Sequence, residues 1–328
     1  MPKLHPDVGN AVFYLYRDDP KTGKRTGPHG TGFIVAVQSA THANVRHFYG
    51  VTNWHVANDL GASIIRINTR DGKSRFIELG PEDWHFLRNG DDLSVADLGG
   101  YEREEDQVGH YRIDSMIVDN MFIDRTEISV GEDVFMIGLY AEQHGGQRNT
   151  PAIRFGNLSL LADENAPIEQ PNGNLRPSHL VDMRSRTGFS GSPVVLYRIP
   201  NNDLSDIPPR PPRHLPMPGS GTHARSKFIA LLGVHCGQYW DNVKVRKKRP
   251  TGHERDGDPI HEGDNLYIQG AMNIVVPAWR IKELLASESF EMARKRRDEE
   301  LKDEAMHRAQ PDSAEVLIGL ESIDETPL

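Results

Sequence analysis

Short apolar or alternating segments recur along the chain from residue 11 to residue 274, and polar or turn-forming residues separate them. Asp71-Gly72, for example, is typical of a tight hairpin turn between two strands. No helical pattern intervenes between successive segments, so the βαβ alternation of a parallel α/β fold is not expected. The segments form two sets of six, at residues 11–16, 31–37, 47–54, 63–69, 74–79 and 93–98, and at residues 134–138, 152–161, 179–183, 192–197, 228–235 and 265–274. This pattern predicts an all-β fold of two six-stranded antiparallel β-barrels.

The remaining segments predict the limits of the domains. Seven prolines between residues 200 and 218 favour an extended surface loop, because proline lacks a backbone donor and fixes φ. After Pro277, residues such as Ile281 and Leu284 fall on one helical face, and a charge-rich solvated helix continues from them. We expect an N-terminal barrel at residues 8–115 and a C-terminal barrel at residues 120–276, with inserts at 198–227 and 239–264. A C-terminal helix at residues 277–308 and a flexible tail at residues 309–328 are expected to follow.

The composition excludes several classes of protein. A formal net charge of -9 argues against a molecule that binds nucleic acid or an anionic membrane over its whole surface. The basic cluster at residues 244–249 is interpreted as a solvated loop, with a local nucleic-acid contact as the alternative. Cys236 is the only cysteine, so no intrachain disulfide can form. The chain starts without a signal pattern and has no apolar run of about 18–20 residues, so we expect a cytoplasmic protein without a membrane partner.

Three segments carry side chains that together suit nucleophilic catalysis. A serine hydroxyl needs a base to take its proton, and a neutral imidazole suits that task near neutral pH. The imidazole in turn needs a carboxylate on its other nitrogen, which fixes the tautomer and stabilises the charged form. His55, Asp92 and Ser190 supply these groups in the order His, Asp, Ser. Asp91 and Asp97 are alternatives for the acid.

A chemical requirement explains why a glycine stands two residues before this serine. A developing oxyanion requires two backbone N–H groups that point at the same position. Glycine at position 188 allows the chain to turn so that its own N–H and that of Ser190 converge. The sequence therefore predicts an oxyanion hole formed by Gly188 and Ser190.

Taken together, these motifs resemble the trypsin-like, two-barrel serine peptidases of the chymotrypsin superfamily, over residues 8–285. The bacterial branch that holds the HtrA/Deg and glutamyl endopeptidases is the most similar. The motifs read GTGFIV, VTNWHV, DDLSVADL, TGFSGSPVV and LLGVHCG. The resemblance implies a general base at His55, an orienting acid at Asp92 and a nucleophile at Ser190, acting through an acyl-enzyme without a metal or cofactor. Asp92 is preferred because the acid of the family immediately precedes a strand such as Leu93-Ser94-Val95.

The resemblance also implies which residues bind the substrate. Glutamyl endopeptidases carry a histidine in a G-[IV]-H-x-G segment that contacts the acidic side chain before the scissile bond, and His235 occupies that position. The implied pocket residues are His235, Cys236, Gly237, Arg184, Ser185, Arg186 and Thr187. Two arginines and two hydroxyls in one wall favour an anion. In the alternative interpretation, both arginines face water and His235 only hydrogen-bonds a neighbour.

Two further residues lie near the proposed nucleophile or the proposed pocket and are interpreted separately. Phe189 stands where the family has a small or polar residue, and a ring there predicts a narrower cleft. Cys236 is interpreted as a small buried hydrophobe rather than a second nucleophile.

The function that the sequence predicts is a serine endopeptidase acting on peptide or protein substrates, with a preference for an acidic residue before the scissile bond. The alternative is a catalytically inactive trypsin-like module that binds peptides. Since unregulated proteolysis inside a cell is harmful, we expect narrow specificity or an activating protein partner.

Overall fold

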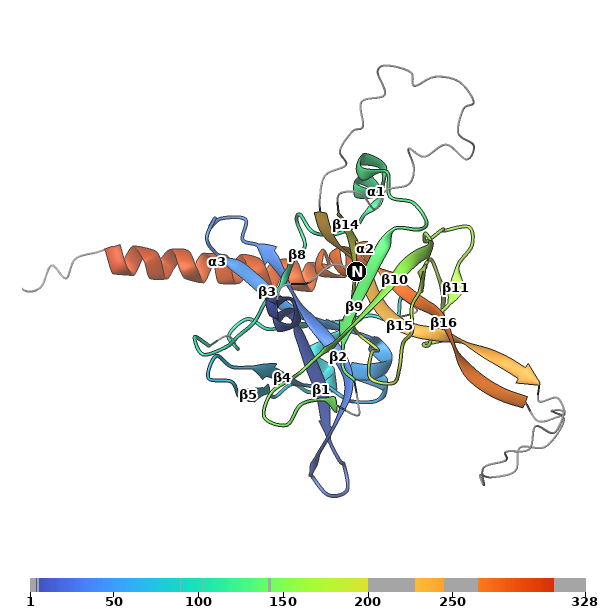
Figure 1. Cartoon of the computed structure of the whole chain (residues 1–328). Helices are drawn as coiled ribbons and strands as arrows, with labels where there is room; N and C mark the ends of the chain where they lie inside the picture. The colour runs from blue at the N-terminus through green and yellow to red at the C-terminus, as the bar shows by residue number, and fades with distance from the viewer. Residues whose placement is uncertain are drawn as a thin grey trace, which may run out of the picture.

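The computed structural model describes residue 4 and residues 6–88, 90–101, 103–140, 143–199, 228–244 and 265–309. Most of the two expected inserts, and the expected tail from residue 310, lie outside these residues. Strands dominate the described chain, and two helices follow the last strand (Figure 1). None of the described helices has both the length and the apolar character that a membrane span requires.

The first unit is one eight-stranded sheet. Its path runs β5-β4-β1-β2-β3-β7-β6, and β8 pairs in parallel with β2. A short 3₁₀ turn precedes it at Pro6–Ala11. The strands are β1 (Val12–Asp18), β2 (Arg25–Gln38), β3 (Arg46–Thr52), β4 (Ile64–Asn68), β5 (Ser74–Ile77), β6 (Trp84–His85), β7 (Ser94–Asp97) and β8 (Tyr111–Arg112).

This sheet differs from the six-stranded barrel that the sequence predicts, because among the described residues no ladder joins its end strands β5 and β6. The chain between them enters a 3₁₀ turn at Pro81–Asp83, whose proline has no N–H to donate. Side chains bridge this region instead. Ser63 Oγ donates to the carbonyl of Leu79 at 2.7 Å, and the buried Trp84 donates its indole N–H to the carbonyl of Ser63 at 3.0 Å.

The second unit is a closed six-stranded barrel in the order β10-β13-β16-β15-β14-β9, which confirms the expectation for this part of the chain. Strands β15 and β16 are long and continue beyond the barrel as a two-stranded ribbon (Figure 1). The barrel strands are β9 (Asp133–Gly138), β10 (Ala152–Leu160), β13 (His179–Asp182), β14 (Pro193–Arg198), β15 (Phe228–Lys244) and β16 (Asn265–Pro277).

Two small elements of the second unit have no periodic signal in the sequence. Helix α1 (Asn120–Thr126) begins where the Asp119 side chain accepts a hydrogen bond from the N–H of Phe122. A hairpin of two-residue strands, β11 (Ile168–Glu169) and β12 (Leu175–Arg176), lies between β10 and β13. Such short strands cannot show the alternation that identifies a longer one.

The C-terminal segment forms two helices rather than the single one expected. Helix α2 (Ala278–Leu285) is followed by its C-cap residue Ala286, and α3 (Glu288–Ala309) begins after Ser287, whose carbonyl accepts from the N–H of Glu291. Helix α3 is also less solvated than its sequence predicts where it crosses the first unit. Asp298 is buried there, and its carboxylate accepts hydrogen bonds from Ser39 Oγ at 2.8 Å and His47 Nε2 at 3.0 Å.

One apolar cluster extends through both units and fixes their relative position. Phe33 and Val51 of the first unit belong to the same cluster as Ile137 and Val195 of the second, and Ile281 of α2 completes it. Burial of this much apolar surface is the main favourable term that holds two such units together. A site on the boundary between the units is therefore built on rigid elements.

Candidate active site

His55 and Asp92 meet because of strand register. Strands β3 and β7 pair antiparallel with Thr52 opposite Ser94, so the chain that follows β3 lies beside the chain that precedes β7. Asn53 and Trp54 follow β3, and His55 then begins a short helical turn, η2 (His55–Asp59). Its Nδ1 lies 2.6 Å from Asp92 Oδ2, and its backbone N–H donates to Asp92 Oδ1 at 2.9 Å.

This pairing fixes the histidine tautomer. A carboxylate only accepts, so Nδ1 carries the proton and Nε2 keeps a free lone pair. The Asp92 side chain is fully buried, whereas the His55 side chain is 26% exposed. The acid is therefore shielded from water while the basic nitrogen belongs to a side chain that solvent and ligands can reach.

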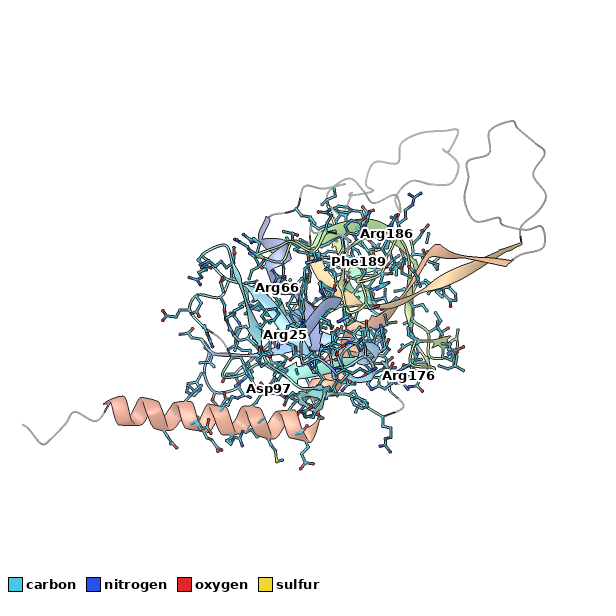
Figure 2. The ribbon with its side chains drawn as sticks, turned by 90° about the horizontal axis from the view of Figure 1, so that it is seen from below. Arg25, Arg66, Asp97, Arg176, Arg186 and Phe189 are labelled. Carbon is cyan, nitrogen blue, oxygen red and sulfur yellow. The ribbon has the colours of Figure 1, made fainter. Side chains whose placement is uncertain are left out.

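The two alternative acids contact other groups. Asp91 forms ion pairs with Arg176 at 3.4 Å and with Arg280 at 3.5 Å. Asp97 forms an ion pair with Arg297 of α3 and accepts from the N–H of Gly99, and it lies next to that helix (Figure 2). Within the described chain, neither carboxylate contacts His55.

Ser190 lies in a loop whose backbone demands glycine on both sides. Gly188 has φ +102° and Gly191 has φ +84°, which side chains disfavour. A Cβ atom at position 191 would also lie 2.0 Å from the carbonyl oxygen of Thr31. In the described part of the chain, the N–H of Phe189 donates to the carbonyl of Arg186, whereas those of Gly188 and Ser190 have no protein acceptor. These two N–H groups are the pair that the sequence assigns to an oxyanion hole.

Thr31 of β2 holds this loop from the first unit. Its buried hydroxyl donates to the carbonyl of Gly188 at 2.7 Å and accepts from the N–H of Leu139 at 2.8 Å. Its backbone N–H donates to the carbonyl of Ser190 at 2.9 Å. The sequence analysis missed this role, although Thr31 lies inside the GTGFIV motif.

His55 and Ser190 line the same cavity, which has a volume of about 650 Å³ and lies between the two units. Among the described residues, no hydrogen bond joins these two side chains. The first unit contributes His29, His55, Val56 and Leu60, and the second contributes Glu169, Gln170, Pro171, Gly173, Ser185, Arg186, Thr187, Gly188, Ser190, His235, Gly237, Gln238, Tyr239 and Ile274.

The cavity includes most, but not all, of the predicted pocket residues. Ser185, Thr187, His235 and Gly237 line it, as does Arg186. Two predicted pocket residues, by contrast, are not part of its lining: Arg184, which is exposed, and Cys236, which is buried. Alternation along β15 explains the position of Cys236, because neighbouring side chains of a strand point to opposite sides.

Cys236 belongs to the apolar cluster that extends through both units. Its thiol is hydrogen-bonded to the carbonyl of Ile274 at 3.5 Å, and burial raises the pKa of the thiol. Since the thiolate is the reactive form, the residue is a poor nucleophile.

Phe189 does not narrow the cavity as the sequence predicts. Its ring is fully buried and packs in the core of the second barrel with residues such as Met136 and Val194. The guanidinium of Arg154 lies 6.0 Å from the centre of this ring. Phe189 and Arg186 lie on the same loop (Figure 2). Phe189 is buried, whereas Arg186 lines the cavity.

His235 is held by its neighbours. Nδ1 lies 3.1 Å from the carbonyl oxygen of Phe189, and Nε2 lies 3.0 Å from Asn273 Oδ1 and 3.3 Å from Ser185 Oγ. The Asn273 amide nitrogen donates to the carbonyls of Met183 and Ala271, so its oxygen must face His235. Burial lowers the pKa of His235 to about 4, which leaves the ring neutral near pH 7.

Comparisons with known proteins identify similar structures but no similar sequences. No protein-family model and no curated protein matches the chain. The chain is similar to the MamO protease domain from Magnetospirillum magneticum, with 15% identity and a TM-score of 0.44 over 87% of this chain and 100% of that chain. It is also similar to the active form of the Rv3671c protease from M. tuberculosis, with 15% identity and a TM-score of 0.41 over 86% of this chain and 83% of that chain. Both scores describe a loose likeness of fold.

Proposed function

We propose that the protein is a serine endopeptidase that cleaves peptide bonds through Ser190, His55 and Asp92. The pairing of His55 with a fully buried carboxylate, in the cavity that also holds Ser190, is the observation that carries this proposal. A histidine with Nδ1 bound to a carboxylate presents a basic Nε2, which is the requirement for removing a hydroxyl proton. The resemblance of the motifs to trypsin-like peptidases supports the same assignment.

The proposed reaction follows from these groups. His55 Nε2 takes the proton of Ser190 as its oxygen attacks the carbonyl carbon of the substrate. The N–H groups of Gly188 and Ser190 stabilise the negative charge that develops on the carbonyl oxygen. His55 then returns the proton to the leaving amine, and water releases the acyl group by the same steps in reverse. Asp92 keeps the ring oriented and stabilises its charged form throughout.

A second candidate function is a peptide-binding module without catalysis. The observation that favours it is the cavity of about 650 Å³ between the units, which can hold part of a peptide whether or not catalysis follows. Incubation with a peptide library separates the two functions. A peptidase yields new termini with a consistent residue before the cut, whereas a binding module retains peptides without cutting them. Retention without cleavage, under all conditions in which the protein is folded, would contradict the proposed activity.

Within this function, we propose that an acidic residue precedes the scissile bond. Arg186 lines the cavity together with the hydroxyl-bearing Ser185 and Thr187. A carboxylate that enters a partly dry pocket gains charge-assisted hydrogen bonds from such groups. Arg186 supplies the positive charge that recognises the carboxylate, because His235 is buried and burial lowers its pKa to about 4.

The kcat/KM for peptides with Glu before the scissile bond is expected to exceed that for matching Gln peptides by about ten- to a hundredfold. Arg186→Gln should lower this ratio toward one. Arg184→Gln is the matched control, since its side chain is exposed outside the cavity, and it should retain the ratio. The ratio should stay constant between about pH 6 and 8, because the pKa of His235 is about 4 and its ring does not titrate there. A profile dominated by Ala, Val or Leu would contradict the acidic preference.

A further inference from the structure

We infer that Gln170 is a positioning residue that holds Asp92 in place from the opposite unit. The inference rests on the proposed function, in which Asp92 orients His55. Gln170 follows β11, in the turn of the β11–β12 hairpin of the second unit, whereas Asp92 precedes β7 of the first. The hairpin therefore reaches across the boundary between the units to the acid.

The contacts of the Gln170 side chain are fully specified. Its Oε1 accepts from the backbone N–H of Asp92 at 2.6 Å. Its Nε2 donates to Asp91 Oδ1 at 3.1 Å and lies 3.0 Å from the hydroxyl of Ser178. An N–H only donates and a carboxylate only accepts, so only one orientation of the amide fits. The residue is 2% exposed.

Other residues of the hairpin hold the same segment of the first unit. The amide nitrogens of Asn172 and Asn174 donate to the carbonyl of Gly90, at 3.2 Å and 2.9 Å. Arg176 of β12 forms the ion pair with Asp91. These bonds fix the backbone on the N-terminal side of Asp92, while His55 holds its carboxylate on the other side.

Together these contacts hold both the backbone N–H and the carboxylate of Asp92. With the backbone N–H held by Gln170, the side chain of Asp92 extends toward His55 with little freedom to rotate. Loss of the Gln170 amide would leave the N–H of Asp92 buried without an acceptor, and the backbone would shift to find one. Since the bond between Asp92 and His55 is only 2.6 Å long, such a shift would weaken it.

The hairpin is also part of the substrate cavity. Glu169, Gln170, Pro171 and Gly173 line it, so the element that holds the acid also faces the bound peptide. A purely structural contact between the units would affect stability alone. A positioning residue must in addition change the environment of His55, and the test is designed to measure that.

The test compares Gln170→Met, which keeps the length of the side chain and removes its hydrogen bonds, with wild type. Leu175→Ala is the matched control, because Leu175 lies on the same hairpin and is 64% exposed. Two quantities are measured in the full chain: the low-field proton resonance of His55 Nδ1, with its titration, and the rate at which a fluorophosphonate probe labels Ser190.

For Gln170→Met we expect the low-field resonance to move toward its ordinary position or to broaden. The labelling rate at neutral pH should fall by about 10–100-fold, the cost of a misplacement near 1 Å. With a cleavable peptide, kcat should fall more than KM rises. Leu175→Ala should match wild type in all of these.

A folded Gln170→Met protein with an unchanged resonance and labelling rate would overturn the inference. If that variant does not fold, Gln170→Asn keeps a buried amide but is one methylene shorter, so its oxygen no longer reaches the N–H of Asp92. It should show the same change in the resonance, and an unchanged resonance would be equally decisive. Failure of the proposed function is distinguishable, because wild type would then resist labelling while the resonance still responded to Gln170→Met.

Discussion

Ser190→Ala is expected to abolish acyl-enzyme formation and to lower kcat by about 10⁴–10⁶-fold. The substitution removes a single oxygen atom from a partly buried side chain, so the fold and the melting temperature should stay close to those of wild type. Peptide cleavage measures the activity, and circular dichroism measures the melting temperature. Near-wild-type turnover by Ser190→Ala would show that another residue is the nucleophile.

His55→Ala provides the internal comparison for this prediction. Because the nucleophile acts only when the base removes its proton, loss of either residue should cost about the same. The double variant should therefore be little worse than either single variant. Additive losses in the double variant would show that the two residues act independently.

Asp92→Asn is expected to lower kcat by about 10⁴-fold. An asparagine can turn its NH₂ group toward His55 Nδ1, which would then accept rather than donate. The proton of the ring would move to Nε2, the nitrogen that must take the proton of Ser190. The loss should appear in kcat, measured with a cleavable peptide at saturating concentration.

Asp97→Asn is the control for this second prediction. Asp97 pairs with Arg297 of α3 at a partly exposed site, so its loss should have a small effect on stability and almost none on kcat. Asp91 is unsuited as a control, because its carboxylate binds Gln170, Arg176 and Arg280. A larger loss of kcat in Asp97→Asn than in Asp92→Asn would contradict the assignment of the acid.

The sequence predicts the longer strands of both units because such strands leave a periodic signal, whereas its choice of Asp92 as the partner of His55 rests on the resemblance to a known family. The apolar segments at 47–54 and 93–98 correspond to β3 and β7, whose pairing brings the two residues together. The closed second barrel follows from six such segments. The glycine at 188 marks a turn that the structure reproduces with positive φ.

Other features of the site could not be predicted, for physical reasons that differ. The β11–β12 hairpin consists of strands too short to show alternation, so nothing in the sequence places Gln170 beside Asp92. The path of the first sheet depends on side-chain bridges such as Trp84 to Ser63, which periodicity does not report. The burial of Phe189 depends on the space inside the second barrel, and that space is known only once the strands are packed.

Intact-mass measurement after treatment with a fluorophosphonate probe tests the central claim most directly. The probe requires a serine that a neighbouring base activates, and it is independent of the substrate sequence. We expect a single adduct on wild type, its location at Ser190 in a peptide digest, and no adduct on Ser190→Ala. Absence of any adduct on folded wild-type protein, from about pH 6 to 9 and with candidate activating proteins present, would contradict a catalytic role for Ser190, His55 and Asp92.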